Sequence, residues 1–475
     1  MPRKKGKPPT APAQQVLLGT LSAGVAVHIV VAATGKVLAS GTLEPEVPEI
    51  SGSIAASQPL QTAQATGTVT LEGAAAGTST ARGDLSVTHR FIPTPLPMVP
   101  DAFSSSRHAD IPSAFPLQGW VNAHHNAHMG DGGWQEGSDG FPHFVFEQPQ
   151  GRALISFRPS QPARVDDTIR QSLWDQVKQL SDTDGDVVFA ALAQWMHPAH
   201  RDAEGLTWIT SSAILDYRGI TPVMKREGRK RYRAGHRTED LQKIAACWER
   251  LRITYLDLQQ VRILEARPGK RPKPSKYTLE TEFFRIPDQI TQEQLDGGRL
   301  AMAWRYRPGR WVDRYLDKPN RQTALLLQRT LQYDPYRDRW EKRLARYFLF
   351  HLRINEGDGG SEPLRRIAGQ LIEELNLLEF VDRRNPRRTV DRFEKAMGQL
   401  LDDGQIGSWE YTDKAQAKLK DLPARNWLDA WLAAAAITVA APKAGQEQYA
   451  ALAERTQLSQ QRAQKLLEGR RPGER

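Results

Sequence analysis

The stretch 186–281 constrains the fold most, because apolar periodicity and positive charge alternate along it in a fixed order. Apolar residues at helical spacing predict helices at 186–197, around Tyr217 and at 238–251. A dense basic run separates the second helix from the third, and two strand-like pieces follow the third. The predicted order is therefore three helices and then a β-hairpin whose tip, 267–276, is rich in Lys, Arg and Pro.

The same order recurs further along the chain. An amphipathic helix ends at a Gly-rich segment, a second covers 363–375, and a third covers 389–402. Thr389 is the expected N-cap of that third helix, and Gly404 stands where a C-cap glycine belongs. A basic run precedes this helix too, and residues 405–412 are typical of a strand.

The repeated order predicts a mainly α-helical protein with small β-wings. Two winged-helix domains would occupy 166–290 and 336–415, joined by a connector at 291–335. Residues 1–165 are rich in Ala, Gly, Ser, Thr and Pro, which favours a largely flexible, low-complexity region with a few weak strands. Residues 427–475 predict C-terminal helices that end either in a short helix-turn-helix or in a plain helical hairpin.

Composition narrows the class of partner. The 475 residues include 65 Lys and Arg against 55 Asp and Glu, which gives a formal net charge of +10 and a pI near 9.6. Such a balance favours a polyanion such as nucleic acid, or an anionic membrane surface. No apolar run approaches the about 20 residues of a membrane span, so we expect no membrane partner. The single cysteine, Cys247, excludes an intramolecular disulfide, and we expect it to be buried.

The N-terminus allows two interpretations. A basic segment at 3–7 precedes an apolar stretch at 16–33, as in a bacterial export signal. His28 interrupts that stretch, and the alternation from Val25 to Val31 equally predicts a small β-hairpin. We favour the hairpin and a cytoplasmic protein, because an arginine-rich chain suits nucleic acid inside the cell.

A histidine group is the one candidate for a metal site. His124, His125 and His128 lie in a Gly-rich segment without a carboxylate or cysteine at ligand spacing. We therefore expect surface histidines, no metal and no cofactor. Aspartates at 182, 184 and 186 alternate as in a calcium loop, but the required Gly and downstream Glu are missing, so Asx-turns before a helix explain them better.

Enzymatic motifs are weak in this sequence. Gly35-Lys36 and Gly269-Lys270 lack the following Ser or Thr of a phosphate-binding loop. A nickase would need metal-binding histidines in a strand, and His124-His125 is predicted to lie in a loop. A tyrosine recombinase needs convergent Arg, Lys and His around a tyrosine, which Tyr333 or Tyr336 would supply with Arg343, Arg346 and His351. We expect no catalysis and keep a recombinase or nickase as the alternative.

The basic segments are instead the candidates for contact with duplex DNA. In many DNA-binding proteins a helix in the third position enters the major groove, while basic loops hold phosphates. Helices 238–251 and 389–402 would supply base readout, and the tip 267–276 would act as a phosphate or minor-groove finger. The predicted DNA-binding residues are Lys225, Arg226, Arg229, Lys230, Arg231, Arg233, Arg237, Gln242, Lys243, Arg250, Lys270, Arg271, Lys273, Lys276, Arg383, Arg384, Arg387, Arg388, Arg392, Lys395 and Gln399.

From residue 186 to 412, this arrangement resembles Rep-type plasmid replication initiators with tandem winged-helix domains. The resemblance rests on the order of elements, on helices 238–251 and 389–402, and on their basic approaches at 225–237 and 383–388. It implies a plasmid or mobile-element initiator that recognises origin repeats in double-stranded DNA, with host replication proteins as partners and a homodimer as one assembly. A transcriptional regulator is the alternative within the same chemistry.

Overall fold

The computed structural model describes most of the chain beyond residue 95 and five strands before it. The described residues are 25–30, 37–43, 53–55, 61–71, 79–89, 96–103, 107–127, 133–159, 166–227, 230–233, 235–267, 270–293, 299–316, 323–356, 363–423, 425–443 and 446. They divide into two compact units, one of residues 1–95 with 292–298 and one of residues 96–291 with 299–475. The predicted C-terminal helix-turn-helix at 446–470 lies almost wholly outside the described residues.

The first unit is built from antiparallel strands. Its strands β1 (Val25–Val30) and β2 (Val37–Leu43) form the hairpin that the alternation at 25–31 predicted. A second sheet has the order β3-β4-β5. Its strands are β3 (Ser53–Ala55), β4 (Gln61–Leu71) and β5 (Ser79–His89).

In the second unit, a first module follows the order helix–strand–helix–helix–strand–strand, apart from two β-hairpins inserted before and after its third helix. The strands pair in the order first–third–second, β10-β16-β15. The stacked rings of Trp248 and Trp304, 5.2 Å apart, pack the third helix against this sheet. The elements are α3 (Asp182–Met196), β10 (Thr207–Thr210), α4 (Ser211–Tyr217), α5 (Thr238–Arg252), β15 (Phe284–Glu293) and β16 (Arg299–Pro308).

A second module repeats that order and the same strand pairing, β18-β20-β19. Between its last two strands the chain inserts α11 (Asp413–Lys420) and α12 (Trp427–Ala434). The other elements are α8 (Arg339–Glu356), β18 (Leu364–Ile367), α9 (Ala368–Glu374), α10 (Pro386–Asp402), β19 (Ser408–Tyr411) and β20 (Ala436–Ala440).

Local sequence explains the third helix of this module. Asn385 caps α10 by accepting a hydrogen bond from the Arg388 amide, and Pro386 opens the first turn. Thr389, which we predicted as the cap, lies inside the helix and accepts a hydrogen bond from the Asp382 amide instead. The helix ends before Gly404, whose φ of 69° suits glycine.

The remaining elements of the second unit include a further sheet, a strand pair and several helices. A five-stranded antiparallel sheet has the order β14-β13-β9-β8-β7, and β6 pairs with β17. The strands of the five-stranded sheet are β7 (Trp134–Glu136), β8 (Pro142–Gln148), β9 (Gly151–Phe157), β13 (Thr254–Arg267) and β14 (Lys270–Glu282). The other elements are β6 (His108–Pro112), α1 (Phe115–His125), α2 (Asp167–Lys178), η1 (Pro198–His200), β11 (Met224–Glu227), β12 (Lys230–Arg233), η2 (Arg310–Val312), α6 (Asp313–Leu316), β17 (Thr323–Leu327), α7 (Gln328–Gln332) and η3 (Leu378–Phe380).

The predicted class, mainly α with small β-wings in tandem winged-helix domains, is wrong, because the protein is mixed α/β with several antiparallel sheets. The pieces predicted as a small wing, 254–267 and 270–282, are long strands of the five-stranded sheet. Part of the region predicted as largely flexible supplies the rest of that sheet and α1. Helix α1 lies so close to it that a Cβ at Gly119 would be 3.1 Å from the Phe146 ring.

Among the described residues, the helices are too short or too polar to cross a membrane.

Candidate nucleic-acid interface

The N-terminal end of α10 carries the densest exposed positive charge for which side chains are described. Arg383, Arg384, Arg387 and Arg388 are all exposed. The approach to the helix is ordered, because the Asp382 carboxylate accepts hydrogen bonds from the Arg384 and Asn385 amides at 3.1 and 2.9 Å. The four arginines therefore stand on a defined backbone at the start of a 17-residue helix.

The charges of this cluster are weakly neutralised. Arg383 lies 3.7 Å from Asp429 and Arg388 lies 3.8 Å from Asp382, and both arginines are exposed in pairs that water and salt screen. Among the described residues, no carboxylate is within 4.0 Å of Arg384 or Arg387. Positive charge at a helix N-terminus opposes the helix dipole, whereas an anion bound there would meet both the dipole and the guanidinium groups. The arrangement suits a phosphate.

Other predicted residues of α10 contribute differently. Lys395 is exposed, as expected for contact with DNA. Arg392 instead donates hydrogen bonds to the buried Glu341 carboxylate at 2.7 Å and to the Arg337 carbonyl at 2.8 Å. Gln399 donates to Asp403 at 2.9 Å. Arg392 and Gln399 are thus engaged within the protein.

The face of α5 differs from the prediction. Arg237, Gln242 and Lys243 are exposed, but Arg250 is buried and its Nε donates to the Asp184 carboxylate at 2.7 Å. The expectation that Arg250 lies on an exposed face is wrong, because it neutralises a buried aspartate of α3. The exposed part of α5 also carries Glu239 and Glu249, so this helix presents mixed charge.

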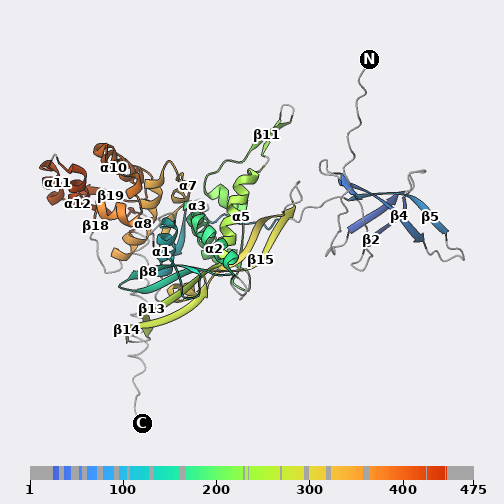
Figure 1. Ribbon diagram of the computed structural model, residues 1–475, viewed down its shortest axis with the longest axis horizontal. Coiled ribbons are helices and arrows are strands. Elements are labelled where there is room, and N and C mark those ends of the chain that lie inside the picture. Colours follow the sequence, from blue (N-terminus) through green and yellow to red (C-terminus); the bar gives the residue numbers. More distant parts are fainter. Residues whose placement is uncertain are drawn as a thin grey trace, which may run out of the picture. The chain divides into compact units, whose positions relative to one another are not determined.

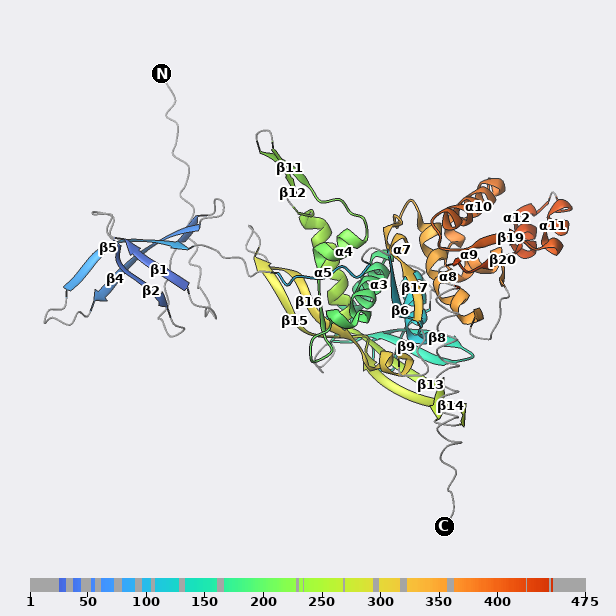
Figure 2. The same ribbon diagram turned by 180° about the vertical axis from the view of Figure 1, so that it is seen from behind.

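The basic run between α4 and α5 forms a β-hairpin whose two strands, among the described residues, pair only with each other. Strands β11 and β12 pair in the register Lys225↔Tyr232 and Arg226↔Arg231. Lys230 and Arg233 lie on β12; Arg229 and the side chains of this hairpin lie outside the described residues. In both ribbon views the hairpin and α10 project from the upper side of the second unit (Figures 1 and 2).

The predicted wing tip is placed elsewhere. The strands extend to Arg267↔Lys270, so Arg271, Lys273 and Lys276 lie within strand β14 and not in a loop. Lys276 is exposed and 3.4 Å from the Gln260 side chain. The β13–β14 hairpin runs along the lower side in both views, away from α10 and from β11–β12 (Figure 2). The segment predicted as a finger therefore does not share a face with them.

The histidine group is buried and not on the surface, which corrects our expectation. His124, His125 and Asp182 offer ligand atoms within 4.8 Å of one another, whereas His128 lies outside the described residues. Arg346 already supplies a cation there: its Nη1 donates to Asp182 Oδ1 at 2.6 Å and to His124 Nε2 at 3.1 Å. Burial lowers the pKa of both histidines, so they are neutral. A metal ion would have to displace a paired guanidinium.

The alternating aspartates belong to a buried ion network that joins the two modules. Asp186 of α3 accepts from Lys342 at 2.8 Å, from Arg346 at 2.7 Å and from Arg218 at 2.9 Å. Burial would raise the pKa of Asp182, but the adjacent imidazoles of His124 and His125 and the charges of Arg346 and Arg343 hold it well below its usual value. The three aspartates lie within α3 and not in turns before it, and they neutralise buried cations.

The same network contains residues that the recombinase alternative would need at its active site. Arg343 and Arg346 are buried against Asp182, and Arg343 also donates to the Leu375 carbonyl at 2.9 Å. Tyr333 is buried and donates to Asp403 at 2.8 Å. Arg343, Arg346 and Tyr333 are thus engaged within the protein, whereas Tyr336, the other candidate tyrosine, is exposed.

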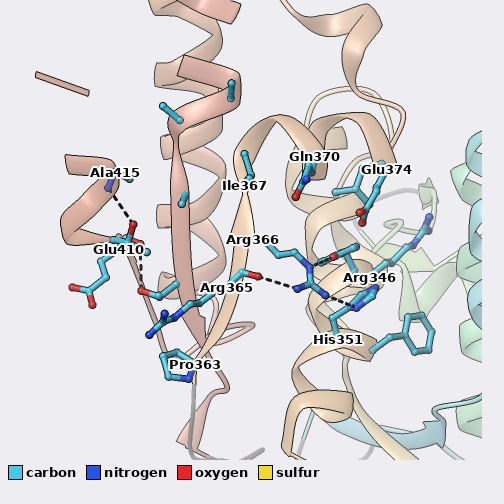
Figure 3. Close-up of a pocket in the computed structure, with 18 of the residues that line it drawn as sticks. Arg346, His351, Pro363, Arg365, Arg366, Ile367, Gln370, Glu374, Glu410 and Ala415 are labelled. Atoms are coloured by element: carbon cyan, nitrogen blue, oxygen red, sulfur yellow. Dashed lines mark hydrogen bonds between the residues drawn. The ribbon is translucent and has the colours of Figure 1, made fainter. Parts of the chain in front are cut away.

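A cavity of about 1010 Å³ lies between α1, α8 and the sheet of the second module (Figure 3). The Arg366 guanidinium donates to the Tyr347 hydroxyl at 2.6 Å and approaches His351 Nδ1 at 3.4 Å. Arg365 points to the other side of β18. Glu374 and Glu410 stand among the lining cations, so the cavity does not offer a polyanion a uniformly positive surface.

Cys247 is buried, and burial raises the pKa of its thiol well above the usual value, as expected for an inert cysteine.

Comparison with known proteins gives only weak likeness. No family model matches the chain, and no curated protein is similar to it. A structure of selenomethionine derivatives of domains 2 and 3 of RctB is 13% identical, with a TM-score of 0.32, and covers 60% of this chain and 85% of its own. A structure of RctB domains 2-3 is 12% identical, with a TM-score of 0.29, and covers 55% of this chain and 77% of its own. These TM-scores are too low to assign a fold or an activity.

Proposed function

We propose that this protein binds double-stranded DNA sequence-specifically and acts as a replication initiator of the plasmid or mobile-element type. The observation that carries DNA binding is the cluster of four exposed arginines at the N-terminal end of α10. Helix dipole and guanidinium groups there favour the same ligand, a phosphate. The basic β11–β12 hairpin on the same side of the second unit extends that surface.

The role in replication rests on the resemblance of residues 186–412 to Rep-type initiators and on the repeat of one module order in the second unit. Two modules fixed by a buried ion network suit a site with two parts at constant spacing. Host replication proteins as partners, a homodimer and the absence of catalysis are part of the same proposal.

The test is equilibrium binding of the full chain to a library of duplex DNA at several salt concentrations. We expect one preferred sequence. The variant Arg384→Ala, Arg387→Ala, Arg388→Ala should reduce the slope of log K against log salt by about three, since each lost phosphate contact removes about 0.9. The matched control is Lys414→Ala, Lys418→Ala, Lys420→Ala on α11, which removes three exposed lysines and should leave the slope unchanged.

The location of the preferred sequence separates replication from regulation. Repeats beside an AT-rich stretch in the parent replicon support initiation, and a site over a promoter supports the regulator. Binding with a steep salt slope and no preferred sequence contradicts specific recognition. Absence of binding, or equal slopes for the two triple variants, contradicts the proposed interface.

A further inference from the structure

A rigid turn before α8 presents an exposed tyrosine. The Tyr336 side chain is 81% exposed, whereas the backbone around it is fixed. The Asp334 carboxylate accepts hydrogen bonds from the Tyr336 and Arg337 amides, each at 2.8 Å, and the Asp338 amide donates to the Asp334 carbonyl at 2.9 Å. An aromatic ring on a fixed backbone loses little conformational entropy when it binds.

Two arginines fasten this turn to its neighbours. Arg392 of α10 donates to the Arg337 carbonyl at 2.8 Å while it pairs with Glu341. Arg339 donates to the Pro335 carbonyl at 3.1 Å, and its guanidinium lies 4.3 Å from the centre of the Phe380 ring. The turn is therefore held between α10 and the segment with Phe380 that precedes α10.

The turn adjoins the arginine cluster of α10. Arg392 follows Arg388 by one helical turn, so the two side chains emerge from the same face of the helix. The turn held by Arg392 therefore lies beside Arg388 on the protein surface. Arg337 is exposed and adds another positive charge at this place.

We propose that the Tyr336–Arg337 turn is a second contact on the duplex bound by α10. Arg337 binds a backbone phosphate next to those held by Arg387 and Arg388, and the Tyr336 ring packs on the adjoining sugar. Arg392 is a positioning residue that fixes the turn, and not a base reader as the sequence predicted. The inference rests on the proposed binding of DNA by α10.

The test uses the full chain and its selected duplex. Arg337→Ala should weaken binding about tenfold and reduce the salt slope by about one, because it removes one phosphate contact. Tyr336→Ala should weaken binding with the slope unchanged, since the ring carries no charge. Phosphate-ethylation interference should lose one position in Arg337→Ala, next to positions that depend on Arg387 and Arg388.

Arg392→Ala separates positioning from direct contact. If Arg392 holds the turn, this variant loses the same interfering phosphate as Arg337→Ala and keeps those of Arg387 and Arg388. Loss of a different phosphate would show that Arg392 itself contacts DNA and would overturn its positioning role. The thermal midpoint of each variant verifies that the fold is retained.

Matched controls are Lys420→Ala, an exposed cation on α11, and Leu401→Ala, a 40% exposed apolar residue at the far end of α10. Neither should alter the affinity or the interference pattern. Turn variants that behave like these controls, while the α10 arginine variants lose binding, overturn this inference alone. A full chain that binds no duplex overturns the inference together with the proposed function.

Discussion

Asp186 shows how much a single buried residue determines in this protein. Its carboxylate is fully buried and accepts hydrogen bonds from Lys342 and Arg346 of α8 and from Arg218, which follows α4. Burial lowers the pKa of Lys342 to about 8, even though Asp186 opposes that shift. Removal of the carboxylate would deprive Lys342 of its acidic partner in a region of low dielectric constant, whereas Arg346 would keep Asp182.

We predict that Asp186→Asn lowers the free energy of unfolding by about 3–5 kcal/mol, the cost of leaving buried charges uncompensated. Urea unfolding followed by circular dichroism measures it. The control is Asp175→Asn, which breaks an exposed pair with Lys178 on α2 and should leave the midpoint unchanged. Equal midpoints for the two variants would show that the network contributes little.

His351 predicts a pH dependence. Burial, and then the charge of Arg366, lower its pKa from 6.5 to about 4. The folded state therefore binds fewer protons than the unfolded state between these pH values, and stability should fall as the pH drops from 6.5 to 4. The loss from this residue is about 3 kcal/mol at most, at 1.36 kcal/mol per pKa unit.

Unfolding free energies of the wild type and of His351→Gln, measured from pH 4 to 7, isolate this effect from that of the carboxylates. The two curves should converge or cross toward low pH, since only the wild type loses the contribution of His351. Parallel curves would mean that His351 titrates normally in the folded state.

At the scale of elements, local sequence predicted helices such as α3, α5 and α10, but it missed α1 and assigned strand β18 to a helix at 363–375. It predicted the sheets poorly. Helices α5 and α10 follow apolar stripes that are complete within the element, such as Ile244 and Trp248 in α5. The five-stranded sheet depends on pairs such as Phe157↔Thr254, whose partners are about a hundred residues apart. Periodicity within one segment contains no signal for such a pair, and 254–282 was therefore predicted as a small wing.

The same limit applies to the candidate site. The charge pattern identified the arginine cluster of α10, which needs no distant partner to be exposed. It misjudged Arg250, because its burial depends on Asp184, a residue 66 positions earlier. It did not suggest Tyr336 and Arg337 as DNA contacts, because the contact of Arg392 with the Arg337 carbonyl, which places that turn beside α10, is seen only in the structure.

We predict that the β11–β12 hairpin contributes to DNA binding independently of α10. Changing Arg226, Arg229, Lys230 and Arg231 to Gln should reduce the salt slope by about three to four, if each cation holds one phosphate. Stability should stay unchanged, because the hairpin pairs only with itself. Isothermal binding and urea unfolding of the same preparation measure both. An unchanged slope would exclude this hairpin from the interface.

At the scale of the molecule, we propose that duplex DNA lies on one side of the second unit. Helix α10 and the β11–β12 hairpin project from that side, and the β13–β14 hairpin runs along the other (Figures 1 and 2). The buried network of Asp182 and Asp186 with α8 joins the modules that carry the two cationic elements. One duplex should therefore meet both elements at a constant separation.

Positioned DNA cleavage tests this claim most directly, and the buried Cys247 leaves the chain suitable for attaching a thiol-reactive iron chelate elsewhere. The chelate would be carried by Lys395→Cys on α10, by Arg231→Cys on β12 or by Lys276→Cys on β14. We expect the chelates at Lys395→Cys and Arg231→Cys to cleave the selected duplex at two separate places. We expect no cleavage from Lys276→Cys. Cleavage from Lys276→Cys without cleavage from Lys395→Cys would contradict the claim.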